Sequence, residues 1–172
     1  TEVCTEYNEQ GRDAVVRLIE EDVKKSIAHI EALTGNKFDD DKNPLLVSVR
    51  SGARVSMPGM MDTVLNLGMN DKVVEALSEK SGNPRFAWDS YRRFVQMYGD
   101  VVLGMKPKNK TDIDPFEEVI EKVKAEKGVK FDTELDVNDL KTLVKLFKEA
   151  VLKNTGRDFP ESAWEQLWSA IC

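Results

Sequence analysis

Apolar residues recur at intervals of three or four along most of the sequence, which is the spacing of one face of an α-helix. The pattern therefore predicts a mainly α protein. The longest such stripe precedes Gly35, a fitting helix stop, and consists of Val15, Ile19, Val23, Ile27, Ile30 and Leu33. Comparable patterns predict further helices over residues 1–11, 60–67, 71–80 and 86–103, and from residues 115, 136 and 160 onward.

Several of these helices have recognisable first residues. Asp71 and Asp136 are expected as N-terminal caps, because an aspartate side chain can accept the free N–H groups of a first turn. Pro115 and Pro160 suit the first turn itself, where no N–H is needed. These signals make the helix starts easier to predict than the loops between them.

One short segment, Leu45–Val49, has the composition of a β-strand: it is apolar, partly β-branched and preceded by turn-forming residues. A single strand cannot form a sheet, so a partner must come from elsewhere in this chain or from outside it. We expect residues 1–70 to hold this β element and residues 71–172 to form a helical subdomain. The predicted core of the subdomain consists of Phe94, Tyr98, Phe116, Ile120, Leu140, Val144, Phe147, Leu167 and Trp168.

The composition excludes some classes of function. With 172 residues the chain suffices for one compact domain or two small ones. Lys plus Arg number 25 and Asp plus Glu 31, a net charge of -6, which argues against nucleic acid and an anionic membrane surface as partners. No apolar run approaches the roughly 20 residues of a membrane helix. The two cysteines, Cys4 and Cys172, have no pairing pattern, which favours a reduced, intracellular protein.

The segment from Ser48 to Thr63 carries the candidate chemistry. It combines a strand end, Arg50 and Arg54, small flexible residues such as Gly59, and a predicted helix start. Arginine offers a fork of donors to phosphate oxygens, glycine allows close backbone approach, and a helix start favours anions. The segment has neither the Gly-Lys-Ser/Thr end of a Walker loop nor the glycine spacing of a dinucleotide fingerprint. A phosphate site and an ordinary loop with solvated arginines both remain open at this point.

Longer stretches of the sequence resemble the pyruvate phosphate dikinase family, and the similarity continues in order through essentially the whole chain. A match of this length is more specific than any short motif. The stretches are residues 1–4 (TEVC), 45–54 (LLVSVRSGAR), 57–68 (MPGMMDTVLNLG), 82–94 (GNPRFAWDSYRRF) and 126–133 (EKGVKFDT).

The resemblance implies an internal part of an N-terminal ATP-grasp domain, so that the β element belongs to an ATP-grasp α+β domain. The family converts ATP, phosphate and pyruvate into AMP, pyrophosphate and phosphoenolpyruvate through a phosphorylated histidine in a central domain. The resemblance also implies that Arg50 contacts the ATP phosphates, and that Gly59 and Thr63 lie at the same phosphates. Arg54 has no family role that can be assigned. ATP, Mg²⁺ and the remaining domains would be the cofactors and partners of the complete enzyme.

Two hypotheses follow for the chain as given. The first is a fragment of that phosphotransferase, which alone should not complete the reaction, because the family's opening glycine-rich segment and lysine, its magnesium ligands and its phosphorylated histidine are expected outside these residues. The second is a free-standing helical binding or regulatory domain. The start without Met and the end within a predicted helix favour the fragment. His29 is expected at the surface, no Cys/His/carboxylate spacing indicates a metal site, and the cytoplasm or an organelle would fit.

Overall fold

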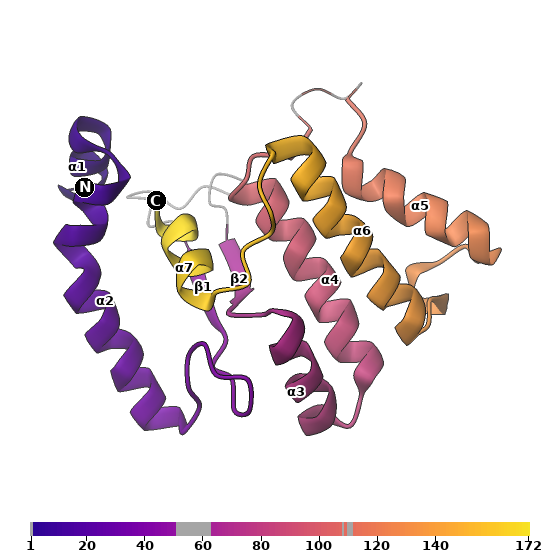
Figure 1. Ribbon diagram of the computed structural model, residues 1–172, viewed down its shortest axis with the longest axis horizontal. Coiled ribbons are helices and arrows are strands. Elements are labelled where there is room, and N and C mark those ends of the chain that lie inside the picture. Colours follow the sequence, from indigo (N-terminus) through magenta and orange to yellow (C-terminus); the bar gives the residue numbers. More distant parts are fainter. Residues whose placement is uncertain (1, 51–62, 108, 110–111) are drawn as a thin grey trace.

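The computed structural model describes residues 2–50, 63–107, 109 and 112–172. These residues form seven α-helices, a short 3₁₀ helix and two β-strands (Figure 1), which confirms the mainly α class. The helices are α1 (Glu2–Gln10), α2 (Arg12–Thr34), α3 (Asp71–Ser81), α4 (Pro84–Val101), α5 (Pro115–Lys127), η1 (Asp132–Glu134), α6 (Val137–Thr155) and α7 (Ala163–Ile171), and the strands are β1 (Val47–Arg50) and β2 (Thr63–Leu67).

Side-chain caps determine where the helices begin. Asp136 caps α6 as predicted, since its carboxylate accepts two backbone N–H groups of the first turn. The cap of α3 is Asn70, whose side chain accepts two such groups, so Asp71 is the first helical residue rather than the cap. The last helix was predicted to begin at Pro160, but α7 begins after Ser162. The hydroxyl of Ser162 accepts an N–H group of the first turn, which a proline side chain cannot do.

The helix predicted over residues 60–67 is wrong for its described part, because residues 63–67 form β2. The strand pairs antiparallel with β1, with Val47 opposite Leu67 and Val49 opposite Val64. Short apolar runs fit a strand and a helix equally well by spacing, and pairing decides between them. β2 also supplies the partner that the single predicted strand required, and residues 60–62 lie outside the described part.

Helix α4 is the centre of the fold (Figure 1). It contacts α3, α6 and β2, while α5 lies against α6 and α7 against both strands. The predicted core is confirmed, with all its members buried except the half-buried Trp168. The same hydrophobic core continues through Leu67 and Met69 to Ile27 and Phe38. The division between residues 1–70 and 71–172 stays a prediction.

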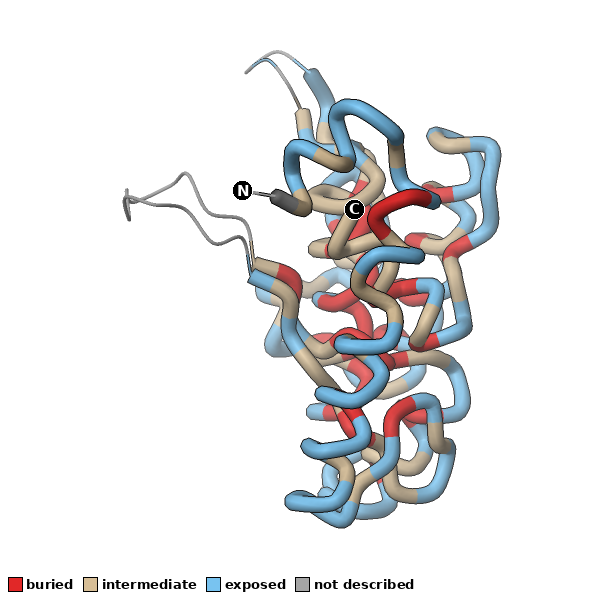
Figure 2. The backbone as a smooth tube through the Cα atoms, turned by 90° about the vertical axis from the view of Figure 1, so that its left-hand side faces the viewer, coloured by how far each residue is buried: buried red, intermediate tan, exposed pale blue. Residues whose placement is uncertain are grey.

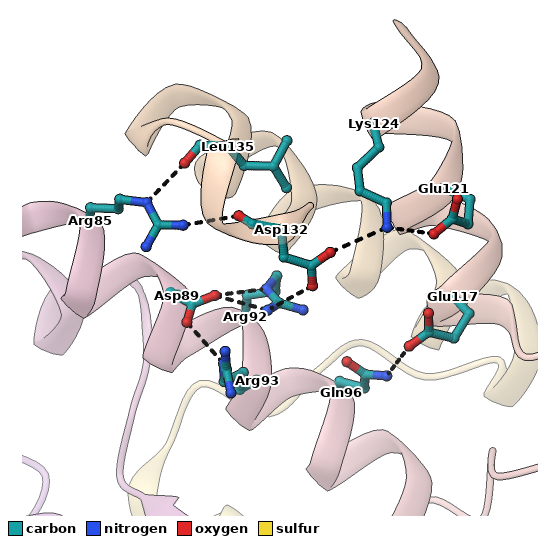
Figure 3. Close-up of polar contacts among 10 residues, drawn as sticks. All are labelled: Arg85, Asp89, Arg92, Arg93, Gln96, Glu117, Glu121, Lys124, Asp132 and Leu135. Atoms are coloured by element: carbon teal, nitrogen blue, oxygen red, sulfur yellow. Dashed lines mark hydrogen bonds and ion pairs between the residues drawn. The ribbon is translucent and has the colours of Figure 1, made fainter. Parts of the chain in front are cut away.

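A polar cluster joins α4 to η1 and to the residues after it (Figure 3). Arg92, 3% exposed, pairs with Asp89 one turn earlier at 2.8 Å and with Asp132 of η1 at 3.5 Å. Arg85 donates to the backbone carbonyls of Asp132 and Leu135. Since η1 lies between α5 and α6, these contacts hold the α5–α6 connection against α4.

Buried residues lie on the inner sides of the helices and exposed residues on the outer turns (Figure 2). Helix α2 departs from this pattern. Val15 and Ile27 of its predicted apolar stripe are buried, but Leu33, at the end of that stripe, is 73% exposed and Leu18 is 58% exposed. The stripe therefore predicted the helix correctly, while only part of it enters the core.

Candidate functional site

The two strands bring two of the three predicted phosphate-contacting residues together. In the antiparallel register Arg50 is the partner of Thr63, and this is the last described pair of the hairpin. Side chains of directly paired residues lie on the same face of a sheet, with Cβ atoms about 4.5–5.5 Å apart. The structure thus holds an arginine and a threonine side by side where residues 51–62 leave β1 and enter β2.

The environment of this pair suits an anion from solvent. Arg50 is exposed and Thr63 is half-buried. Neither side chain takes part in an ion pair or a side-chain hydrogen bond among the described residues, so their donors are available to a ligand. Gly59 and Arg54 lie outside the described residues. The helix start expected around Thr63 is wrong, because Thr63 begins a strand and its hydroxyl therefore has no helix dipole beside it.

A buried glutamine fixes the other end of the hairpin. Gln166 of α7 has no exposed surface; its Oε1 accepts the N–H of Gly68 at 2.8 Å and its Nε2 donates to the carbonyl of Met69 at 2.9 Å. The same Nε2 donates to the carbonyl of Pro160 at 2.7 Å. Every polar atom of this side chain is therefore satisfied by backbone, and α7 holds the end of β2 in place.

A cleft of about 480 Å³ lies between β2 and the C-terminal half of α4. Leu65, two residues after Thr63 and so on the same side of the strand, is 49% exposed and lines it. Asp100 of α4 lines it as well, and its Oδ1 is buried and accepts no hydrogen bond from the part of the chain that the structure describes. Burial, with a smaller contribution from Asp114, raises the pKa of Asp100 to about 6.

Two of these polar residues, Asp100 and Gln166, carry little signal in the sequence. Asp100 stands near the end of an amphipathic helix, where an acidic residue is ordinarily solvated, and Gln166 stands in a helix start rich in polar residues. Their roles depend on contacts with residues distant in the sequence. For Gln166 the sequence gives one indication, the helical spacing of α7, which puts position 166 on the same buried face as Ala163 and Leu167.

The described residues contain no group of three or more His, Cys, Asp or Glu side chains that could hold a metal ion. His29 is exposed on α2, as expected. None of the described helices is both long and apolar enough to cross a membrane.

Comparison with known proteins identifies the family. The sequence model of one protein family, described as the pyruvate phosphate dikinase AMP/ATP-binding domain, matches residues 5–91. This range includes both strands and the Arg50–Thr63 pair. Since this match covers half of the chain, the chain belongs to that family. The resemblance seen in the sequence is thereby confirmed.

Individual relatives are similar over nearly the entire chain. The pyruvate, phosphate dikinase of Clostridium symbiosum is 52% identical over 99% of this chain, and that of Rhizobium meliloti 50% over 99%. A chloroplastic pyruvate, phosphate dikinase of Mesembryanthemum crystallinum is 50% identical over 99% of the chain. The aligned regions are 19%, 18% and 17% of these relatives, so the chain spans about a fifth of their length.

Proposed function

We propose that these 172 residues are part of the ATP-binding, ATP-grasp domain of a pyruvate phosphate dikinase, and that Arg50, Gly59 and Thr63 contact the phosphates of ATP. The whole protein would convert ATP, phosphate and pyruvate into AMP, pyrophosphate and phosphoenolpyruvate. The observation that carries the proposal is the pairing of Arg50 with Thr63 on one face of the hairpin, at the two ends of residues 51–62.

The proposed role of Arg50 follows from its place at the end of a strand. Its backbone is held by the ladder with β2, while its exposed guanidinium is free to meet phosphate oxygens. Phosphoryl transfer spreads negative charge over these oxygens, and catalysis there is mainly positioning and electrostatic stabilisation. The Thr63 hydroxyl would donate a second hydrogen bond and the Gly59 backbone would approach the phosphate closely. We assign no Mg²⁺ ligand to the described residues.

The proposal is tested in the complete protein by measuring its two half-reactions separately. Arg50→Ala should slow phosphorylation of the catalytic histidine by ATP by about 10²–10³-fold, the usual cost of losing one such donor. Exchange between phosphoenolpyruvate and pyruvate should be unchanged, because it uses a different site. Arg50→Lys should recover part of the loss, since an ammonium is a point charge without the guanidinium fork.

The matched control is Arg17→Ala, which removes an exposed arginine from α2 and should leave both half-reactions unchanged. Melting curves of all variants exclude a loss of folding. If Arg50→Ala phosphorylates the histidine at the wild-type rate, Arg50 is not at the ATP site. If both half-reactions fall together with the melting temperature, Arg50 only anchors the hairpin.

We further propose that the 172-residue chain alone does not complete the reaction, because the residues of the other domains are outside it. The purified chain should produce no AMP from ATP, phosphate and pyruvate. Steady turnover that is lost in His29→Ala would contradict this. The alternative function, a free-standing helical binding or regulatory domain without catalysis, predicts that the native protein is no longer than such a domain, which the intact mass of the native gene product tests. The proposed location is the cytoplasm, or an organelle where the source resembles the chloroplastic relatives.

A further inference from the structure

The cleft between β2 and α4 contains a carboxylate that the proposed ATP contacts do not use. Asp100 lines it, and its buried Oδ1 has no hydrogen-bond partner among the described residues. Neither oxygen forms an ion pair within 4 Å among the described residues. A buried carboxylate oxygen without a donor is costly, so a ligand that brings an N–H group would gain more here than at a solvated aspartate.

The charges around Asp100 favour a cation over an anion. Asp114, the cap of α5, and Glu117 in its first turn add negative charge near Asp100. Lys106 and Arg93 are the cations among the described lining residues; Lys106 acts on Asp100, and the Nε of Arg93 donates to Asp89 at 2.9 Å. Among the described residues, the charges that act on Asp100 are therefore those of two carboxylates and one ammonium group.

The walls of the cleft are suited to a hydrocarbon stem. Leu65 of β2 and Phe94, Met97 and Val101 of α4 all line it. Lysine and arginine combine an apolar stem of three or four methylene groups with a charged end, and they bury the stem along apolar surface. The exposed Leu65 would be covered by such a stem.

We propose that this cleft receives a lysine or arginine side chain from a protein segment outside these 172 residues, with its charged end paired to Asp100. The proposal rests on the proposed function in one respect, because a longer dikinase chain would supply the segment. Regions outside the alignment make up about four-fifths of the relatives' length. An ammonium or a guanidinium would satisfy the carboxylate, and the bidentate guanidinium fits it best.

The binding chemistry can be tested on the chain itself with butylguanidinium, which reproduces the end and stem of an arginine. Backbone amide shifts in NMR titrations should change along β2 and the C-terminal half of α4, with a millimolar Kd typical of so small a ligand. Butylurea, which has a similar shape but no charge, should not bind. Because the pKa of Asp100 is about 6, affinity should fall about tenfold from pH 7 to pH 5 as the carboxylate takes up a proton.

Two variants with the same change in net charge decide the result. Asp100→Asn should weaken butylguanidinium binding at least tenfold at pH 7. Glu117→Gln removes a neighbouring exposed charge that does not line the cleft, and should weaken it less than threefold. Equal affinities of wild type and Asp100→Asn, or equal binding of butylurea, would overturn the proposal. Neither measurement involves ATP, so failure here leaves the Arg50 test independent.

Discussion

Arg92 and Arg93 offer a sharp test of how burial determines the value of an ion pair. Both pair with the carboxylate of Asp89, at 2.8 Å and 2.9 Å, and both lie on α4. The Arg92 side chain is 4% exposed and that of Arg93 is 69% exposed. We expect Arg92→Ala to destabilise the fold by about 3–5 kcal/mol, the cost of breaking a buried pair. Arg93→Ala should cost less than about 1 kcal/mol, as exposed pairs do.

The magnitude for Arg92 can be divided into two contributions. The substitution by alanine removes two methylene groups of its stem, Cγ and Cδ, each worth about 0.8 kcal/mol when buried. The hydrogen bonds to Asp89 are charge-assisted and contribute about 1.5–3 kcal/mol. Arg92→Met retains most of the stem and removes the charge, so it should recover roughly half of the loss. Asp132, also paired with Lys124, keeps one partner in each variant.

Urea unfolding followed by tryptophan fluorescence and circular dichroism measures these differences. With a slope of about 2 kcal/mol per M, a loss of 3 kcal/mol moves the midpoint by about 1.5 M. The Arg93→Ala shift should be under about 0.5 M and should shrink further in high salt, because exposed charges are screened. Equal shifts for Arg92→Ala and Arg93→Ala would refute the argument, since both arginines pair with Asp89 on the same helix and differ in burial and in the additional pair of Arg92 with Asp132.

Three further predictions concern single positions. Gly99→Ala should destabilise the fold by about 1–3 kcal/mol in thermal unfolding despite alanine's higher helix propensity, because the new Cβ would lie 2.5 Å from the ring of Phe116. The loss should be smaller in a Phe116→Leu background, and a stabilised Gly99→Ala variant would contradict this. Gln166→Glu should lower the free energy of unfolding in urea by about 2–4 kcal/mol, because a carboxylate oxygen replaces the amide that donates to the carbonyls of Met69 and Pro160. An unchanged urea midpoint would show that these hydrogen bonds are dispensable. Burial raises the pKa of Asp100 to about 6, so ionisation opposes folding as pH rises from about 4 to 6. Asp100→Asn should therefore be more stable than wild type above pH 6 and lose this advantage below pH 4, whereas a gain independent of pH would exclude ionisation as the cause.

Much of the helical part of the fold could be predicted from local signals. α2, α4, α5 and α6 each combine an apolar stripe with a recognisable start or stop, such as Asp136 before α6 or Gly35 after α2. Such signals act within a few residues, so they are legible in the sequence. The exact starts were less predictable: Asn70 and Asp71 are adjacent potential caps, and the extended backbone at Asn70 decides between them.

The candidate site was predictable only in part. Family resemblance selected Arg50 and Thr63, but Thr63 was expected in the first turn of a helix over residues 60–67. Residues 63–67 become a strand because Val47–Arg50 offers a partner and because Val64 and Leu67 are buried in the core. That outcome depends on pairing across the intervening segment, which local spacing does not express.

The sequence by itself determined which segments can be helices, where most of them stop, and which family the chain resembles, because periodicity, caps and long matching stretches are properties of neighbouring residues. Only the tertiary structure decided that Arg92 is buried while Arg93 is exposed, and that no described residue donates a hydrogen bond to one carboxylate oxygen of Asp100. Adjacent or similar residues differ in this way because solvation and partners are set by segments distant in the chain. The interaction energy of a charged side chain with its neighbours is small in water and becomes much larger once packing removes that water.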